Sequence, residues 1–212
     1  MDLTEAVYRS RLTIFKALEA RGFDTAKYNK LGIDEIKVFT TNNYPEYYNG
    51  LDMSIPHSED SAKQIRVFYT DAGKVTQYQR ILNMIEKLEG IDSKTDELIY
   101  MIQDPINDKV HSLVASQLWF KKGIRVSFFC VYEIVVNPLE HVLVPRHEVV
   151  PKDEIPALLK TLRVTERSQL PLIRYHTDPI VRLIGGVPGD IIKITRSSPS
   201  AGEYIVYRAC VP

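Results

Sequence analysis

Strong net charge and long apolar runs are both missing from this chain of 212 residues. Its 27 Lys and Arg side chains balance 27 Asp and Glu side chains, so no overall field draws the free protein onto nucleic acid or an anionic membrane. No stretch approaches the roughly 18 consecutive apolar residues of a membrane-spanning helix. Charged residues interrupt the first 20 positions, so we expect no secretory signal peptide.

Cysteine is also scarce, and no spacing suggests a metal site. Cys130 and Cys210 lie far apart in apolar runs, which favours reduced, buried thiols and a reducing compartment. The closest of the five histidines, His141 and His147, are separated by a proline, and their spacing fits neither a helical zinc pair nor a zinc finger. We therefore expect structural or interface histidines, and neither a metal nor another cofactor.

Hydrophobic periodicity predicts an α/β domain over residues 1–137. Residues 4–20 have the pattern of an amphipathic helix, and residues 42–61 that of a long, mobile connection. The elements predicted beyond it are strands at 65–70, 97–102 and 124–136 and helices at 75–88 and 108–121. Strands that alternate with helices indicate right-handed βαβ units and a parallel or mixed sheet.

The composition changes at Asn137-Pro138, where a β-branched run ends and several prolines follow. This change predicts a domain boundary there. Residues 153–162 predict a helix capped by Asp153, and residues 178–183 predict a short helix with Pro179 in its first position. Residues 190–196 and 203–211 then predict a β-hairpin. The sequence thus predicts a small α+β domain over residues 138–212.

Three short patterns could suggest chemistry, and each has a simpler interpretation. Glu35-Ile36-Lys37 matches the acidic-x-Lys element of magnesium-dependent nucleases, but a match of this length is common by chance. The glycine-rich segment 185–190 lacks the Lys-Ser/Thr of a phosphate loop, and the serines at 197, 198 and 200 lack a nucleophile elbow. A nuclease using Glu35 and Lys37 remains the main enzymatic alternative.

Several ordered motifs in the last third of the chain carry a family resemblance. They are His141-Val142-Leu143-Val144-Pro145-Arg146-His147, then Glu166 to Ile173, Asp178 to Gly185, Gly189 to Arg196, and Ser198 to Arg208. Together they resemble the shared fifth subunit of eukaryotic RNA polymerases I, II and III and its smaller counterpart in archaeal RNA polymerases. The first domain matches this family more loosely, in the order of its elements and in the opening Tyr8-Arg9 helix.

The resemblance implies a non-catalytic structural subunit of a multi-subunit DNA-directed RNA polymerase. In the family, the first domain forms part of the jaw beside downstream duplex DNA, and the second is an assembly domain that docks on the largest subunit. A free-standing transcription factor that reuses the docking module is a second alternative. We expect polymerase subunits as partners, weak duplex binding only within the complex, and no membrane.

The resemblance also selects residues for the assembly interface. These are His141, Leu143, Pro145, His147, Gln169, Leu170, Pro171, Asp178, Pro179, Arg182, Gly189, Arg196, Gly202, Tyr207 and Arg208. Prolines would stiffen the docking segment, glycines would permit its turns, and arginines could make bidentate contacts. Lys109 and His111 are the candidates for contact with downstream DNA, although Asp104 and Asp108 beside them would repel phosphate.

One segment departs from the pattern of most cellular members. Gly185-Gly186-Val187-Pro188-Gly189 replaces an aromatic residue followed by a single glycine. This divergence suggests the polymerase of a large DNA virus or of a distant protist. We therefore expect the nucleus if the protein is cellular, and the virion or a cytoplasmic viral factory if it is viral.

Overall fold

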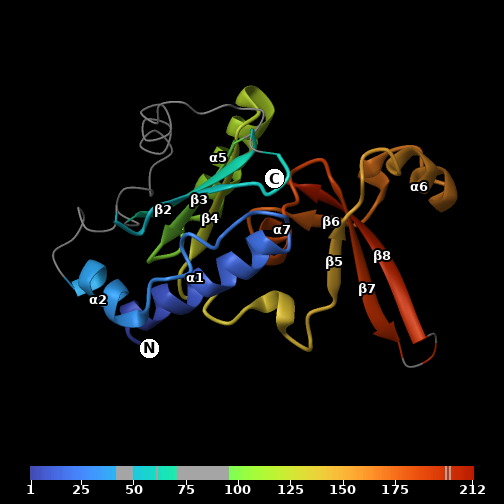
Figure 1. The fold of residues 1–212 in the computed structure, drawn as a ribbon. Coiled ribbons are helices and arrows are strands. Elements are labelled where there is room, and N and C mark those ends of the chain that lie inside the picture. Colours follow the sequence, from blue (N-terminus) through green and yellow to red (C-terminus); the bar gives the residue numbers. More distant parts are fainter. Residues whose placement is uncertain (42–49, 61, 71–95, 199, 201) are drawn as a thin grey trace. The chain divides into compact units, whose positions relative to one another are not determined.

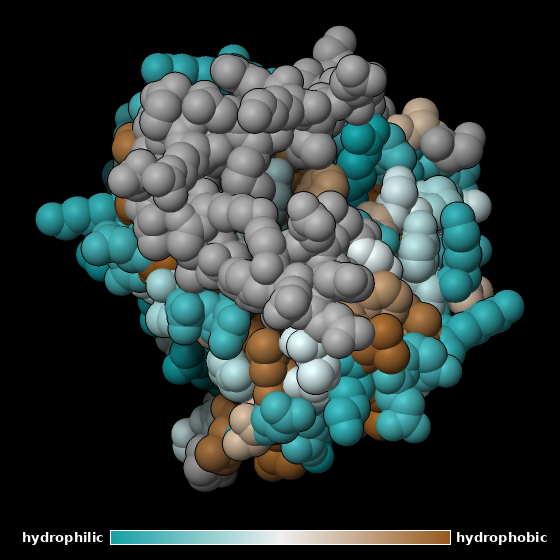
Figure 2. All heavy atoms as spheres, turned by 90° about the vertical axis from the view of Figure 1, so that its left-hand side faces the viewer, coloured by the Kyte–Doolittle hydropathy of each residue, from teal (hydrophilic) through white to brown (hydrophobic). Residues whose placement is uncertain are grey.

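The computed structural model describes residues 1–41, 50–60, 62–70, 96–198, 200 and 202–212 (Figure 1). The chain divides into two compact units, Met1–Asn137 and Pro138–Pro212. Each contains a mixed four-stranded sheet with helices. Among the described residues, no helix is both long and apolar enough to cross a membrane. On the face shown in Figure 2, the described hydrophobic side chains lie in separate patches among hydrophilic ones.

The sheet of the first unit has the order β1-β2-β3-β4. Its strands are β1 (Met53–Pro56), β2 (Gln64–Thr70), β3 (Asp96–Ile102) and β4 (Arg125–Cys130). β1 is antiparallel to β2, whereas the other two pairings are parallel, so the predicted mixed sheet is confirmed. Every residue of β3 is buried, as is typical of a central strand covered on both faces.

Two predictions for this sheet were wrong. The predicted connection at 42–61 contains β1, in which Met53 and Ile55 alternate with exposed residues; four residues give too short a pattern to stand out. The predicted strand at 124–136 ends at Cys130 and is followed by a turn. In that turn the amide of Glu133 donates to the carbonyl of Cys130 at 3.0 Å, so β-branched composition alone did not extend the strand.

Helices of the first unit follow the predicted periodicity in two cases. α1 (Leu3–Glu19) and α5 (Asp108–Gln117) confirm the predicted helices, and α5 continues into the π-helical turn η2 (Leu118–Lys122) before Gly123 at φ 69°. α2 (Ile33–Thr41) was not predicted. The helix predicted at 75–88 lies outside the described residues.

The core of the first unit joins β3 and β4 to α5. The ring of Tyr100 stacks between Phe68 and Phe128, with centroid distances of 5.3 and 5.5 Å. Val114 and Leu118 pack into the same cluster. The parallel strands and the helix that connects them therefore share one apolar core.

The second unit has the sheet order β5-β7-β8-β6. Its strands are β5 (Arg146–Val149), β6 (Leu172–Arg174), β7 (Ile191–Ser198) and β8 (Gly202–Val211). β7 and β8 form an antiparallel pair from Ile191↔Ala209 to Ser198↔Gly202, which confirms the predicted hairpin. β5 is antiparallel to β7 and β6 is parallel to β8; neither of these two short strands was predicted.

Two helices accompany this sheet, and their caps differ. α7 (Pro179–Leu183) begins as predicted, with Pro179 in the first turn. α6 (Ile155–Leu162) begins two residues later than predicted, and Glu154, which occupies its N-cap, makes no side-chain cap hydrogen bond. The prediction of an Asp153 cap was therefore wrong. α6 packs over β7 and β8 through a cluster that contains Val150, Ile155, Leu170, Ile191 and Ala209.

Candidate assembly surface

The segment before β5 displays the most exposed large apolar side chains of the described chain. Val142 and Leu143 are 96% and 84% exposed. The segment is nevertheless held in place: the amide of Val144 donates to the carbonyl of His141 at 2.9 Å, and the amide of Leu143 donates to the ring Nδ1 of His141 at 3.2 Å. An ordered turn that presents apolar side chains to solvent is typical of a protein-binding surface.

The other candidates of this segment connect the turn to β5. Nδ1 of His147 lies 2.7 Å from the carbonyl oxygen of Pro145, and both residues are half-buried. His147 pairs with Ile194 in the sheet. The histidine ring therefore fixes the exit from the turn, while His141, which is exposed, fixes its beginning.

Around the 3-10 turn η4 (Arg167–Gln169), side chains close a capping box. Glu166 and Gln169 cap each other's backbone amides. Pro171 and Gln169 are exposed, whereas Leu170 is buried in the core under α6. Among these candidates, Gln169 and Pro171 are accessible in the isolated chain and Leu170 stabilises the unit.

α7 is organised by Asp178 and Arg182. The Asp178 carboxylate accepts hydrogen bonds from the amides of Ile180 and Val181 at 2.9 and 3.3 Å, and Pro179 follows this N-cap directly. Arg182 is only 3% exposed, and its guanidinium donates to the carbonyls of Tyr175 and His176. Both side chains thus hold the fold of the unit.

The turn that enters the hairpin depends on positive backbone dihedrals and buried polar contacts. Gly189 has φ 101°, a conformation that glycine adopts without steric cost. Its carbonyl accepts a hydrogen bond from the Arg167 guanidinium, and the buried carboxylate of Asp190 accepts one from the amide of Val187 at 2.9 Å. At the far end of the hairpin, Gly202 has φ 74°.

The hairpin carries the remaining candidates. Arg196 is exposed, and Tyr207 and Arg208 are half-buried. Nη1 of Arg208 donates to the carbonyl of Leu172 at 2.9 Å, so this side chain links β8 to β6. Tyr204 and Ile205, which belong to the recognised motif but were not selected as candidates, are 58% and 43% exposed.

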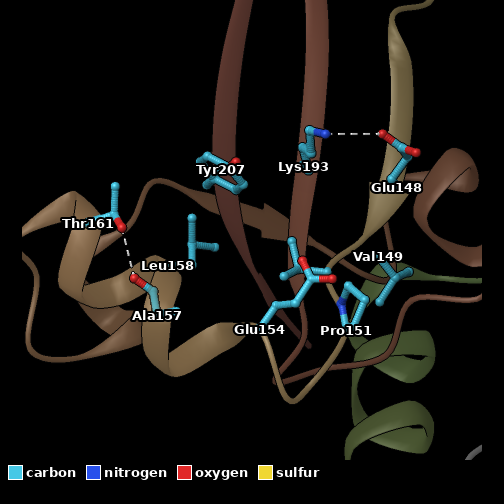
Figure 3. A pocket seen from close by; sticks show the side chains of 10 residues that line it. Glu148, Val149, Pro151, Glu154, Ala157, Leu158, Thr161, Lys193 and Tyr207 are labelled. Atoms are coloured by element: carbon cyan, nitrogen blue, oxygen red, sulfur yellow. Dashed lines mark hydrogen bonds and ion pairs between the residues drawn. The ribbon is translucent and has the colours of Figure 1, made fainter.

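A hollow of about 590 Å³ lies between α6 and the sheet (Figure 3). Tyr207, Lys193 and Glu148 line it from three adjacent strands, and Leu158 and Thr161 line it from α6. Nζ of Lys193 lies 3.6 Å from the Glu148 carboxylate. The residues that line the hollow include two glutamates, Glu148 and Glu154, one lysine and one aromatic ring, and they place no nucleophile beside a base.

The two candidates for DNA contact differ in accessibility. Lys109 is exposed at the start of α5. His111 is 5% exposed, and its ring packs edge-on against Phe128 at 5.2 Å. In the isolated chain, therefore, Lys109 is the accessible side chain of the pair and His111 belongs to the core of the first unit.

The residues of the nuclease alternative do not converge. Glu35 and Lys37 are exposed on α2, two positions apart, and side chains at that spacing point to different sides of a helix. Within the part of the chain that the structure describes, no group of three acidic, His or Cys side chains could hold a metal ion.

Buried carboxylates of the first unit are instead paired with arginines. The Glu97 carboxylate contacts Arg21 and lies 3.3 Å from Arg125. Burial alone would raise the pKa of Glu97, but the guanidinium groups of Arg125 and Arg21 hold this pKa below its ordinary value. Asp96 likewise lies 3.6 Å from Arg66. Arginine side chains of the same chain therefore compensate the negative charge of these two carboxylates.

Comparisons with known proteins agree with the two-unit architecture. A family described as "RNA polymerase Rpb5, C-terminal domain" matches residues 136–210. The chain is also similar to "DNA-directed RNA polymerases I, II, and III subunit rpabc1" of Dictyostelium discoideum, with 34% identity over 163 residues. That alignment covers 76% of this chain and 79% of the relative.

Archaeal relatives match over a shorter length. The protein named "DNA-directed RNA polymerase subunit Rpo5" of Sulfurisphaera tokodaii is 50% identical over 76 residues, which are 36% of this chain and 88% of the relative. Its namesake in Archaeoglobus fulgidus is 51% identical over 72 residues, which are 34% of this chain and 92% of the relative. The archaeal proteins are thus close in length to the second unit alone.

Proposed function

The chain belongs to the family of the fifth subunit of DNA-directed RNA polymerases, and we propose that it is a structural, non-catalytic subunit of such an enzyme. The observation that carries the proposal is similarity to a eukaryotic shared subunit over most of both chains. The described residues are consistent with it, because Glu97 and Asp96, the buried carboxylates of the first sheet, are paired with arginines. The exposed candidates of the second unit include the apolar Leu143 and Pro171. Polymerisation chemistry would then reside in other subunits.

We assign the two units different roles. Residues 138–212 would be the assembly domain that docks on the largest subunit, because the family match falls on 136–210 and the archaeal relatives consist of little more than a region of this length. Residues 1–137 would be the jaw domain near downstream DNA. Lys109 is its accessible candidate for a phosphate contact, and one such contact contributes little at physiological salt.

Location follows from the relatives. The Dictyostelium relative is named for polymerases I, II and III, so we propose a nuclear location for this chain if it is cellular. A source in a large DNA virus would place it in the virion or a cytoplasmic viral factory instead.

The test is affinity purification of the tagged full chain from its native cells. We expect the largest polymerase subunit to be recovered with the wild-type chain, in a complex far larger than 24.3 kDa on gel filtration. Recovery of the chain alone would contradict the proposal and favour a free-standing factor. DNA cleavage by the pure chain with Mg²⁺, abolished by Glu35→Ala, would favour the nuclease.

Substitutions in the exposed turn at 141–144 test which side chains contribute to this binding. Replacing Val142 and Leu143 by Ser should lower recovery of the polymerase about tenfold, because two apolar anchors would lose their burial at the interface. The melting temperature should not change, since both side chains are exposed in the free chain. Val38→Ser in α2, where the side chain is 55% exposed, is the matched control.

A further inference from the structure

The edge of β8 is partly uncovered. β6 pairs with β8 only at Ala209–Val211, whereas β7 pairs with β8 along its whole length down to Gly202. Among the described residues, no strand of this sheet pairs with β8 on the β6 side between residues 203 and 207. β5 still flanks β7 opposite residues 205–208 of β8, and beyond Thr195 the hairpin continues as a two-stranded ribbon. The edge of β8 that faces away from β7 is therefore open along residues 203–207 (Figure 1).

The direction of the backbone groups at this edge follows from the hydrogen bonds at its base. The amide of Cys210 donates to Asp190 on the β7 side, and the amide of Ala209 donates to Pro171 on the opposite side. Backbone groups alternate between the two sides along a strand. The register of β7 and β8 is continuous, so Glu203, Ile205 and Tyr207 direct their amides and carbonyls to the open edge.

Natural proteins protect open strand edges with lysines, prolines or short strands. Between residues 203 and 207 this edge has no lysine or proline, and Glu203, at its far end, is its one charged side chain. Its side chains instead include Tyr204 on one face and Ile205 on the other, 58% and 43% exposed. An open ladder flanked by exposed aromatic and β-branched side chains is a template for an additional strand.

Charge on the two faces of the hairpin indicates the chemistry of that strand. Residues opposite each other share a face of the sheet, so Tyr204 lies on the same face as Arg196, with which it pairs. Alternate residues of a strand also share a face, so Arg208, four residues after Tyr204 in β8, lies on this face too. Both charged side chains of the described hairpin on this face are arginines. A strand added beside β8 would therefore be favoured by an acidic side chain on the Tyr204 face.

We propose that residues 203–207 of β8 accept an extended, acidic segment of another polymerase subunit as a fifth strand of this sheet. The strand would continue the line of β6 for about 17 Å, the length of five residues. The inference rests on the proposed function, since it specifies how the assembly domain binds its partner.

Ile205→Pro tests the backbone contact in the full chain. The amide of Ile205 points away from β7, so proline removes a donor to the added strand without breaking the hairpin, as edge strands tolerate. We expect on the order of tenfold lower recovery of the polymerase, with an unchanged melting temperature. Ile205→Ala, which keeps the amide, is the matched control and should bind more tightly than the proline variant.

Amide hydrogen exchange supplies a readout that does not depend on a substitution. In the free chain the amides of Ile205 and Tyr207 should exchange faster than those of Val206 and Arg208, which face β7. In the purified complex the first two should become protected. Absence of protection within the complex would overturn the proposal.

The outcomes separate this inference from the proposed function. Failure of the wild-type chain to recover any polymerase subunit would contradict the function itself. Equal recovery by wild type, Ile205→Pro and Ile205→Ala would overturn strand addition and leave the function standing. A pure wild-type chain that is dimeric by light scattering, and monomeric as Ile205→Pro, would assign the edge to a second copy and also overturn the proposal.

Discussion

At the scale of single residues, burial separates side chains that hold the fold from those that can meet a partner. Arg182 was selected from a family motif, yet the residue is 3% exposed and its guanidinium donates to the carbonyls of Tyr175 and His176. Arg196 was selected in the same way and is exposed. The sequence places each arginine in a family motif and cannot show this difference in exposure, because burial depends on tertiary packing.

Arg182→Ala should lower the free energy of unfolding of the second unit by about 3 kcal/mol, because it leaves buried carbonyls without their donor and opens a cavity. Urea unfolding followed by circular dichroism measures this change. Arg196→Ala, at an exposed position, should change the same quantity by less than about 0.5 kcal/mol. Equal effects of the two substitutions would show that Arg182 has no special structural role.

Asp52 is a residue whose ionisation should oppose folding. Burial raises the pKa of its carboxyl to about 6, from an ordinary value of 3.8, although the Tyr69 amide and Arg11 act in the opposite direction. The folded state therefore keeps its proton to higher pH than the unfolded state. This carboxyl costs nothing below pH 3.8, its cost grows between about pH 4 and 6, and it is complete above pH 6.

Asp52→Asn should therefore stabilise the protein at pH 7 by about 1–2 kcal/mol, after allowance for the partial exposure of the carboxyl. The amide oxygen of asparagine can still accept the hydrogen bond that the Tyr69 amide donates at 2.9 Å. Melting temperatures measured from pH 4 to 8 give the difference between variant and wild type. The difference should be smallest at pH 4, and a constant difference would contradict the assigned pKa.

At the scale of elements, a helix start could be predicted where a proline marks its first turn. Asp178 followed by Pro179 marks the start of α7 both in the sequence and in the structure. Asp153 has a similar position before a predicted helix, but α6 begins at Ile155 and the side chain of its N-cap residue makes no capping bond. The sequence suggested one cap, at Asp153, and hydrogen-bond geometry contradicts it, whereas the N-cap at Asp178 was found only in the structure.

Asp178→Ala should lower the free energy of unfolding by about 1 kcal/mol, the usual contribution of an N-cap. Asp153→Ala is its matched control and should have little effect, because Asp153 is exposed and caps no helix. Thermal unfolding of the two variants side by side measures the difference. A larger loss for Asp153→Ala than for Asp178→Ala would contradict these cap assignments.

Strands were predictable where they are long or fully buried. The runs of β2, β3 and the β7–β8 hairpin are seven to ten residues long, and their apolar patterns are evident in the sequence. β1, β5 and β6 have only three or four residues, and they are strands because a longer neighbour offers them hydrogen bonds. Such pairing depends on the tertiary fold, so the local sequence pattern does not predict these short strands.

At the scale of the whole molecule, the candidate surface was visible in the sequence as motifs and not as geometry. The His141 to His147 motif was recognised, but the exposure of Val142 follows from a turn whose hydrogen bonds the sequence does not display. The open edge of β8 required the pairing of β6, a strand that was not predicted. Family motifs thus located the second unit, and strand pairing located its accessible backbone.

The second unit contains its own sheet and an apolar cluster around Val150, Leu170 and Ile191. Residues 138–212 expressed alone should therefore fold, and they should recover polymerase subunits as the full chain does, because the proposed docking surfaces all lie within them. Circular dichroism and affinity purification measure the two properties. A folded fragment that recovers no polymerase would show that residues 1–137 are needed for docking, whereas an unfolded fragment would show that the second unit depends on the first for its stability.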